Sequence, residues 1–231
     1  LQNITTGNST LVVEGNITNQ GTIQDNTPYN FYIQVKGNVA HNGTAWSNDT
    51  LTLNGTADQH VSGNAFTVTN FTVDKTSGKV IANSDLSFSN VVVDFNLCRL
   101  DMPDDGKISL SGQYLRNVNI YGNNLTLDMT GAYLSTHVKV YAKNLTLTGT
   151  VNIGSSVYFY SNLIVVGTLQ NHTTATQTLF VHDYPDTQAS GNITNQGTIQ
   201  NNSPYKFYIE VKGNIVRSEE HTSELQSRQV I

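Results

Sequence analysis

The stretch GNITNQGTIQDNTPYNFYIQVKGN, from Gly15 to Asn38, returns near the other end of the chain as GNITNQGTIQNNSPYKFYIEVKGN, from Gly191 to Asn214. The two copies are identical at 20 of 24 positions and lie 176 residues apart. Such close agreement indicates a duplicated unit, and self-similarity at a fixed spacing is typical of repeat architectures. We therefore expect a tandem array, of which this chain is a fragment.

A shorter period runs through the unit and is marked by apolar segments such as FYIQV. The first five segments begin 20 residues apart, and the later ones follow after 27, 20, 19, 22 and 28 residues. We interpret the longer steps as insertions into individual coils. The segments begin at Leu11, Phe31, Leu51, Phe71, Val91, Val118, Val138, Val157, Leu179 and Phe207.

Alternation within each segment has the period of a β-strand. In FYIQV, the apolar Phe31, Ile33 and Val35 point to one side and the residues between them to the other. Short strands separated by Gly, Asn and Asp predict a chain that coils and stacks each strand on its equivalent in the previous coil. The predicted fold class is all-β: a right-handed parallel β-helix, or β-solenoid, of about ten coils of ~20 residues.

A second strand in each coil is indicated by the segments NLTLDM, NLTLTG and NLIVVG, which begin at Asn124, Asn144 and Asn162. The three asparagines occupy the same position in successive segments. Stacked asparagines can hydrogen-bond one another from coil to coil, as side-chain ladders do in other stacked strands. The alignment therefore predicts a structural asparagine ladder at one corner of the solenoid.

The composition narrows the classes of partner. Charged residues make up 13% of the chain, against roughly 25% in an ordinary globular domain, and the net charge is −5. We expect no nucleic acid partner, because there is no basic run, and no apolar run approaches the ~18 residues of a membrane span. Cys98 is the only cysteine, which excludes an internal disulfide and a thiolate zinc site. We expect no cofactor and no metal.

The last residues of the chain differ in composition from everything before them. The segment RSEEHTSELQS, from Arg217 to Ser227, is charged and lacks the Asn, Gly and Thr of the repeats. It resembles the in-frame translation of a common short-read sequencing adapter, so we exclude it from the fold prediction. The predicted organisation is a single solenoid domain over 1–216 and a non-native tail over 217–231.

Two segments carry a resemblance to known proteins: LTLNGTADQHVSG from Leu51 and NFTVDKTSGKVIANSDLSFSN from Asn70. They resemble the parallel β-helix repeats of bacterial and archaeal secreted surface proteins and adhesins. The resemblance covers nearly all of Leu11 to Val216 and implies a β-helix in an extracellular or cell-surface protein. It implies nothing about activity, because a fold does not specify a function.

Two long excursions between strands carry carboxylates. They are CRLDMPDDGK, which offers Asp101, Asp104 and Asp105, and HDYPD, which offers His182, Asp183 and Asp186. Parallel β-helices include polysaccharide lyases and hydrolases, which need paired carboxylates or a bound Ca²⁺. However, the spacing matches no EF-hand or zinc pattern, and Asp beside Pro and Gly is typical of turns. We expect no catalytic residues, and a carbohydrate-active enzyme is the alternative.

Aromatic residues recur at outward positions of the strands. The two rows are Tyr121, Tyr141 and Tyr160 on three successive coils, and Tyr158, Phe180 and Tyr208 beside them. Coils stacked ~4.8 Å apart would bring these rows together as an aromatic strip. Such a strip would bind sugar rings or pack against a partner, or it would only stabilise the sheet. Both interpretations stay open at this point.

Asn-x-Ser/Thr sequons are frequent in this chain, which is rich in Asn and Thr. They accept a glycan only in a host that glycosylates secreted proteins. We exclude Asn124 and Asn144, because the predicted ladder uses them. The candidate sites are Asn16, Asn42, Asn48, Asn54, Asn70, Asn171 and Asn192.

These patterns favour an extracellular structural or adhesive β-solenoid scaffold of a cell-surface or filament protein, without catalysis. A duplicated array lengthens a rod or multiplies weak binding sites, which raises avidity. The partners expected are glycans or neighbouring copies of the same protein. The alternatives are a carbohydrate-active β-helix enzyme and a glycan-binding module.

Overall fold

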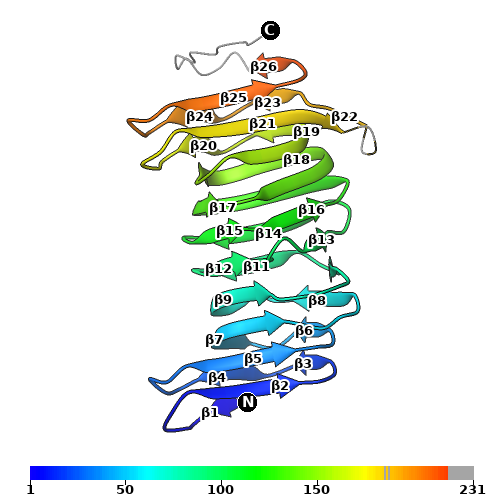
Figure 1. The fold of residues 1–231 in the computed structure, drawn as a ribbon, viewed down its shortest axis with the longest axis vertical. Helices are drawn as coiled ribbons and strands as arrows, with labels where there is room; N and C mark the ends of the chain where they lie inside the picture. The colour runs from blue at the N-terminus through cyan, green and yellow to red at the C-terminus, as the bar shows by residue number, and fades with distance from the viewer. Residues whose placement is uncertain (185, 187, 218–231) are drawn as a thin grey trace.

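The chain forms a parallel β-solenoid of about 11 turns, stacked into a rod with the first residues at one end (Figure 1). The computed structural model describes residues 1–184, 186 and 188–217. The prediction of an all-β parallel β-solenoid is confirmed, with about one turn more than expected. No helix in the described part of the chain could cross a membrane. Residues 218–231, which make up most of the predicted non-native tail, lie outside the described residues.

The described residues contain 26 strands. They are β1 (Gln2–Asn3), β2 (Ser9–Val13), β3 (Ile17–Asn19), β4 (Thr22–Asp25), β5 (Phe31–Val35), β6 (Val39–His41), β7 (Ala45–Leu53), β8 (Gln59–Gly63), β9 (Thr67–Val73), β10 (Val80–Ala82), β11 (Leu86–Ser89), β12 (Val92–Asp94), β13 (Arg99–Asp101), β14 (Gly106–Ser111), β15 (Tyr114–Arg116), β16 (Val118–Tyr121), β17 (Asn124–Leu134), β18 (Val138–Ile153), β19 (Val157–Val165), β20 (Thr168–Asn171), β21 (Gln177–Tyr184), β22 (Ala189–Ser190), β23 (Ile193–Asn195), β24 (Thr198–Asn201), β25 (Phe207–Val211) and β26 (Ile215–Arg217).

Each turn contributes strands to three faces, and equivalent strands of successive turns pair in parallel. Face 1 starts with β3 and β6 and ends with β21 and β25. Face 2 starts with β2 and β5 and ends with β20 and β24. Face 3 starts with β1 and β4 and ends with β23 and β26. The long strand β18 turns two corners and pairs on all three faces.

The apolar segments that mark the short period do not all lie on one face. The series that begins with Leu11 and Phe31 runs up face 2, through β2, β5, β7, β9 and β12. The series that begins with Val118 lies on face 1, in β16, β18, β19, β21 and β25. The 27-residue step from Val91 to Val118 is therefore one turn plus one face, and its interpretation as an insertion is wrong. All three faces alternate in the same way, so alternation cannot distinguish them.

The duplicated unit shows the same displacement. In the first copy, β3, β4 and β5 lie on faces 1, 3 and 2. In the second copy, the corresponding β23, β24 and β25 lie on faces 3, 2 and 1. The 176-residue spacing therefore spans eight turns and one further face. In Figure 1 the β4–β5 and β24–β25 loops nevertheless project to the same side, because the faces twist around the rod.

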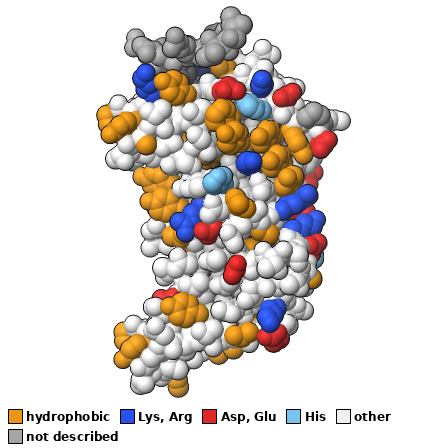
Figure 2. All heavy atoms as spheres, viewed as in Figure 1, with side chains coloured by type: hydrophobic (Ala, Val, Ile, Leu, Met, Phe, Trp, Pro, Cys, Tyr) orange, Lys and Arg blue, Asp and Glu red, His pale blue; other side chains and the backbone are white. Residues whose placement is uncertain are grey.

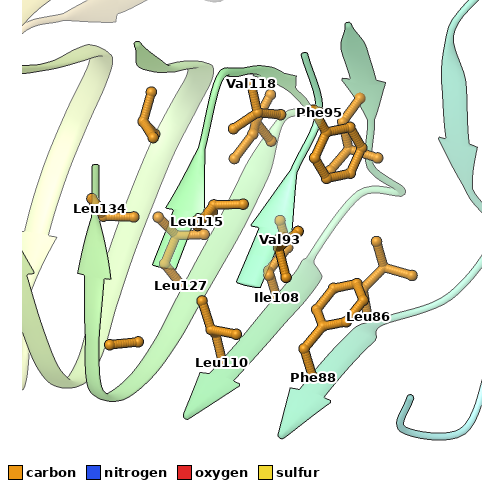
Figure 3. Close-up of a cluster of buried hydrophobic side chains, with 14 of the residues drawn as sticks. Leu86, Phe88, Val93, Phe95, Ile108, Leu110, Leu115, Val118, Leu127 and Leu134 are labelled. Atoms are coloured by element: carbon orange, nitrogen blue, oxygen red, sulfur yellow. The ribbon is translucent and has the colours of Figure 1, made fainter. Parts of the chain in front are cut away.

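Inward side chains from all three faces meet in one continuous core. Figure 3 shows its middle section, where Val93 and Leu115 of face 2 lie beside Leu110 of face 3 and Val118 of face 1. Each of these side chains is at most 2% exposed. Burying one such side chain stabilises the fold by about 1.5–3 kcal/mol. The core thus explains why the alternating pattern produces a filled rod.

A cluster of buried rings fills the core of the first turns. His41, Trp46 and Phe66 lie with ring centres 5.4–5.6 Å apart, and Phe71 and Phe88 continue the cluster. His41 is 1% exposed, and its Nδ1 lies 3.1 Å from Nδ2 of Asn19. Burial lowers the pKa of His41 below its ordinary value of 6.5. The folded chain therefore keeps this imidazole neutral at pH values where the unfolded chain protonates it.

We expect acid to weaken the rod through His41 before the carboxylates titrate. Below pH 6.5 the unfolded state binds the proton and the folded state does not, so the free energy of unfolding falls by at most about 1.4 kcal/mol per pH unit. Urea unfolding at about pH 8 and about pH 5 measures this loss. The His41→Gln variant is expected to be less stable at both values but to show a flatter dependence. An equally steep dependence in the variant would place the effect on another group.

An aromatic strip as the candidate functional site

Five aromatic side chains gather on the outer surface of face 1, in its upper half. Hydrophobic side chains concentrate over this region in Figure 2. The strand register pairs Tyr121 with Tyr141, Tyr141 with Tyr160, and Tyr158 with Phe180. All five are half-buried. We call these residues, Tyr121, Tyr141, Tyr158, Tyr160 and Phe180, the aromatic strip.

The rings of the strip stack face to face along the rod axis. Ring centres lie 4.5 Å apart for Tyr121 and Tyr141 and 4.8 Å apart for Tyr141 and Tyr160, with planes 12° and 2° apart. Tyr158 and Phe180 stack in the same way, at 4.5 Å and 5°. The faces of the middle rings are therefore covered by their neighbours. The strip presents ring edges and hydroxyl groups, so stacking of a sugar on an inner ring face is not available.

Polar groups close both ends of the strip. The guanidinium of Arg99 lies 3.9 Å from the centre of the Tyr121 ring, within cation–π distance. At the other end, the imidazole of His182 meets Tyr160 and Phe180 edge-on, at 6.0 Å and 5.8 Å. His182 Nε2 also lies 3.0 Å from a carboxylate oxygen of Glu210. The strip is thus an apolar row with hydrogen-bonding groups at each end.

Arg99 forms an ion pair with Asp101 of the same strand, β13. Arg99 Nε and Lys79 Nζ each donate to a different oxygen of Asp101, at 2.5 Å. Burial opposes the charge on Asp101, but the hydrogen bonds from Arg99 and Lys79 hold the pKa of that carboxyl below its ordinary value. Burial also raises the pKa of Tyr141 to about 12, so its hydroxyl stays protonated. The strip therefore offers neutral phenols beside a fixed ion triad.

Tyr208 does not belong to the strip, contrary to the sequence prediction. Strand β25 pairs Tyr208 with Thr178 and places Glu210 opposite Phe180. Tyr208 lies two residues short of the row and is 43% exposed. The prediction was wrong because it aligned the segments by their first apolar residue, whereas β21 begins two residues before the segment that starts at Leu179.

The three corner asparagines form a hydrogen-bonded column. Nδ2 of Asn144 donates to Oδ1 of Asn124 at 2.8 Å, and Nδ2 of Asn162 donates to Oδ1 of Asn144 at 3.5 Å. Asp104 continues the column downward, since its Oδ1 accepts from Nδ2 and the backbone N–H of Asn124. These hydrogen bonds hold Asp104 below its ordinary pKa. The carboxylate of Asp104 thus supports the corner.

The other carboxylates of the two excursions do not converge. Asp105 occupies an exposed turn with φ of 57°. Asp183 pairs with Ser190 through the backbone, and Asp186 is exposed. Within residues 1–184, 186 and 188–217, no three His, Cys, Asp or Glu side chains group closely enough to hold a metal ion. The geometry therefore brings together aromatic rings rather than acids.

The candidate glycosylation sites differ in accessibility. Asn16 and Asn42 are exposed, and Asn54, Asn70 and Asn192 are half-buried. Asn48 is 4% exposed, and its Nδ2 donates to two backbone carbonyls, those of Phe31 and Thr50. Asn171 is fully buried, and its Oδ1 accepts from the backbone and hydroxyl of Thr173. A glycan cannot be attached to Asn48 or Asn171 in the folded rod.

Sequence reasoning missed a second amide column, on face 2. Nε2 of Gln170 donates to Oδ1 of Asn152, and Nε2 of Gln200 donates to Oε1 of Gln170, both at 2.8 Å. The three residues are 18 and 30 positions apart, and the first is Asn whereas the other two are Gln, so no fixed period marks them. Sequence reasoning also missed a shallow polar groove of about 500 Å³. The groove lies between faces 3 and 2, with Asp25 and Asp49 at one end.

Tyr184 is a further aromatic residue that the sequence analysis did not include. Its ring centre lies 5.1 Å from that of Tyr141 and 6.1 Å from that of Tyr160, with planes tilted by 59° and 58°. Tyr184 therefore lies across the strip rather than within its stack. Tyr184 ends β21 on the same outward side as Phe180 and His182, but alternation does not show that its ring crosses Tyr141.

Comparisons of the chain with protein-family models, with curated proteins and with solved structures found no match.

Proposed function

We propose that this chain is an extracellular scaffold with an adhesive role and no catalytic activity. The observation that carries the proposal is the aromatic strip: five half-buried rings on one face of a rod, with polar groups at both ends. Surface aromatic groups with polar tips are typical of binding sites, because they supply apolar area at a small entropic cost. The scaffold holds the rings in register, since each stands on a paired strand.

The duplication supports the same proposal. A second copy of the unit lengthens the rod, and loops of both copies project to one side of it (Figure 1). Linked weak sites bind a repetitive partner more tightly than one site does, without any new contact. The partners that suit this arrangement are a glycan or a neighbouring copy of the same chain.

Replacing Tyr121, Tyr141 and Tyr160 together with Ser is expected to abolish retention on immobilised polysaccharides while the rod stays folded. The variant removes three rings and keeps the backbone register, so we expect a loss of retention of about tenfold or more. Affinity chromatography or a pull-down on a polysaccharide panel measures this. Circular dichroism shows whether the strand content is kept.

The matched control is the double variant Tyr114→Ser, Tyr133→Ser. These two rings also stack, with centres 5.3 Å apart, but they lie on face 2. Retention of the control should equal that of the parent protein. Equal retention of the strip variant and the control would remove the strip from the proposal. Absence of both polysaccharide binding and self-association in the parent protein would refute the adhesive role.

A further inference from the structure

The duplication extends further than the two long matching stretches, and its second copy carries an insertion. Residues 1–14 and 169–182 are identical at 8 of 14 positions, with an offset of 168. The following stretches, 15–38 and 191–214, match with an offset of 176. In the first copy Glu14 is followed directly by Gly15, whereas in the second copy eight residues, 183–190, stand between His182 and Gly191.

The corner is built in the same way with and without the insertion. Lys36 N–H donates to the carbonyl of Val13 at 2.9 Å, and in the second copy Lys212 donates to Val181 at 3.0 Å. The next backbone hydrogen bonds also correspond. The N–H of Gly37 donates to the carbonyl of Gly15 at 3.0 Å, and the N–H of Gly213 donates to the carbonyl of Gly191 at 3.1 Å. The first copy therefore closes the corresponding corner, between faces 2 and 1, without the eight residues that stand between faces 1 and 3 in the second copy.

The described ends of the insertion, 183–184 and 189–190, form an antiparallel pair beside the aromatic strip, which we call the hairpin. Asp183 and Tyr184 of β21 pair with β22, which is the one antiparallel pairing among the described strands. Strand β22 lies at the side of the rod beside β21 and β19 (Figure 1). The hairpin lays Tyr184 across Tyr141 and Tyr160. An addition found only in the second copy thus lies on a strip that only this part of the rod possesses.

We propose that this hairpin, through Tyr184, is a binding element which, together with the strip edge at Tyr141 and Tyr160, holds a neutral polysaccharide. This inference rests on the adhesive function proposed above. Strip rings offer edges and hydroxyl groups, and Tyr184 crosses them at a different angle. The hairpin therefore turns a straight row of edges into a shaped surface with apolar and hydrogen-bonding groups in alternation, which suits sugar rings.

The charges around this surface favour a neutral chain over an acidic one. Arg99 and Lys79 share a single carboxylate, that of Asp101, so the triad keeps one net positive charge, and His182 contacts Glu210. One lysine, Lys139, lies 5.8 Å from the centre of the Tyr158 ring. The hairpin adds two carboxylates, those of Asp183 and Asp186. These two carboxylates offset the net charge of the triad and the charge of Lys139, so an anionic polysaccharide would gain little from this surface.

The first test deletes residues 183–190, so that His182 joins Gly191 as Glu14 joins Gly15. We expect the deletion variant to fold, because the first copy closes the corresponding corner of the repeat without the insertion. Retention on an immobilised neutral glucan is expected to fall by about tenfold. The point variant Tyr184→Ala should show a loss of similar size and carries the test if the deletion variant fails to fold. The matched control Tyr184→Phe keeps the ring and should retain binding.

The outcomes separate the hairpin from the general proposal. Binding by the parent protein and loss in both hairpin variants supports the inference. Equal binding by the parent and both variants overturns the inference and leaves the adhesive function in place. Preference for an acidic polysaccharide over the neutral glucan overturns the assigned ligand class. Absence of binding by the parent protein to every polysaccharide overturns both the inference and its glycan partner.

Discussion

Trp46→Ala is expected to lower the free energy of unfolding by about 3–5 kcal/mol, because it empties the centre of the buried ring cluster. The indole is 1% exposed and packs against His41 and Phe66, with ring centres 5.6 Å and 5.4 Å away. Its Nε1 donates to Oδ1 of Asn48 at 2.9 Å. Truncation therefore leaves a cavity and an amide oxygen without its donor, and both effects destabilise the fold.

Chemical denaturation measures the loss, and hydrogen exchange locates it. Turns of a solenoid contact only their neighbours, so the loss of protection should be greatest in β5 to β9 and small beyond β19. Trp46→Phe keeps a ring and loses the hydrogen bond, so its cost should be smaller. The exposed-site control Tyr29→Ala should change stability by less than about 0.5 kcal/mol. Equal destabilisation by Trp46→Ala and Tyr29→Ala would contradict the packing argument.

Gly149→Ala is expected to cost about 3 kcal/mol or more, through two separate effects. Gly149 has φ of +67°, a conformation that costs a residue with a Cβ about 1–2 kcal/mol. A Cβ at this position would also overlap the backbone carbonyl oxygen of Met129 in the turn below. Relieving that overlap requires the two turns to separate, which weakens the ladder between β17 and β18.

Gly131→Ala is the matched control, because it has the strain without the overlap. Its φ is +69°, and a Cβ there would meet nothing within 4 Å. We expect this variant to lose only about 1–2 kcal/mol. The difference between the two variants in thermal or urea unfolding measures the contact between turns. Equal losses would show that turn spacing at this corner adjusts without cost.

The aromatic strip shows how much alternation alone can predict about the residues that face outward. Alternation correctly groups Tyr121, Tyr141 and Tyr160 on one outward row, because each occupies the same position relative to its strand. It fails for Tyr208, because β25 begins opposite Gln177 of β21, two residues before the Leu179 by which the segments were aligned. It also leaves ring orientation undetermined, since stacking planes depend on rotamers that the neighbouring turns impose. Alternation places Tyr184 outward at the end of β21, but it does not show the contact with Tyr141, because the pairing of β21 with β22 has no counterpart in the first copy.

Local patterns in the sequence were sufficient to determine the solenoid itself. Residues such as Ile33 and Val35 alternate with polar ones, so each strand has one buried side. The recurrence of such strands every ~20 residues leaves stacking as the way to cover them. The equal positions of Asn124, Asn144 and Asn162 likewise indicated a shared corner, where the structure places them in hydrogen-bonded contact.

Only the tertiary structure decided which face each strand occupies and what the faces present. The corners contain different numbers of residues from turn to turn. The number of residues between two strands therefore does not determine how far the second strand is rotated around the rod axis. For this reason the second copy of the unit lies one face later than the first, although its sequence is nearly the same. The burial of Asn48 and Asn171 and the placement of Tyr184 over Tyr141 depend on the same long-range stacking. Alternation reports only whether a side chain points in or out, and the neighbouring turns determine what it meets there.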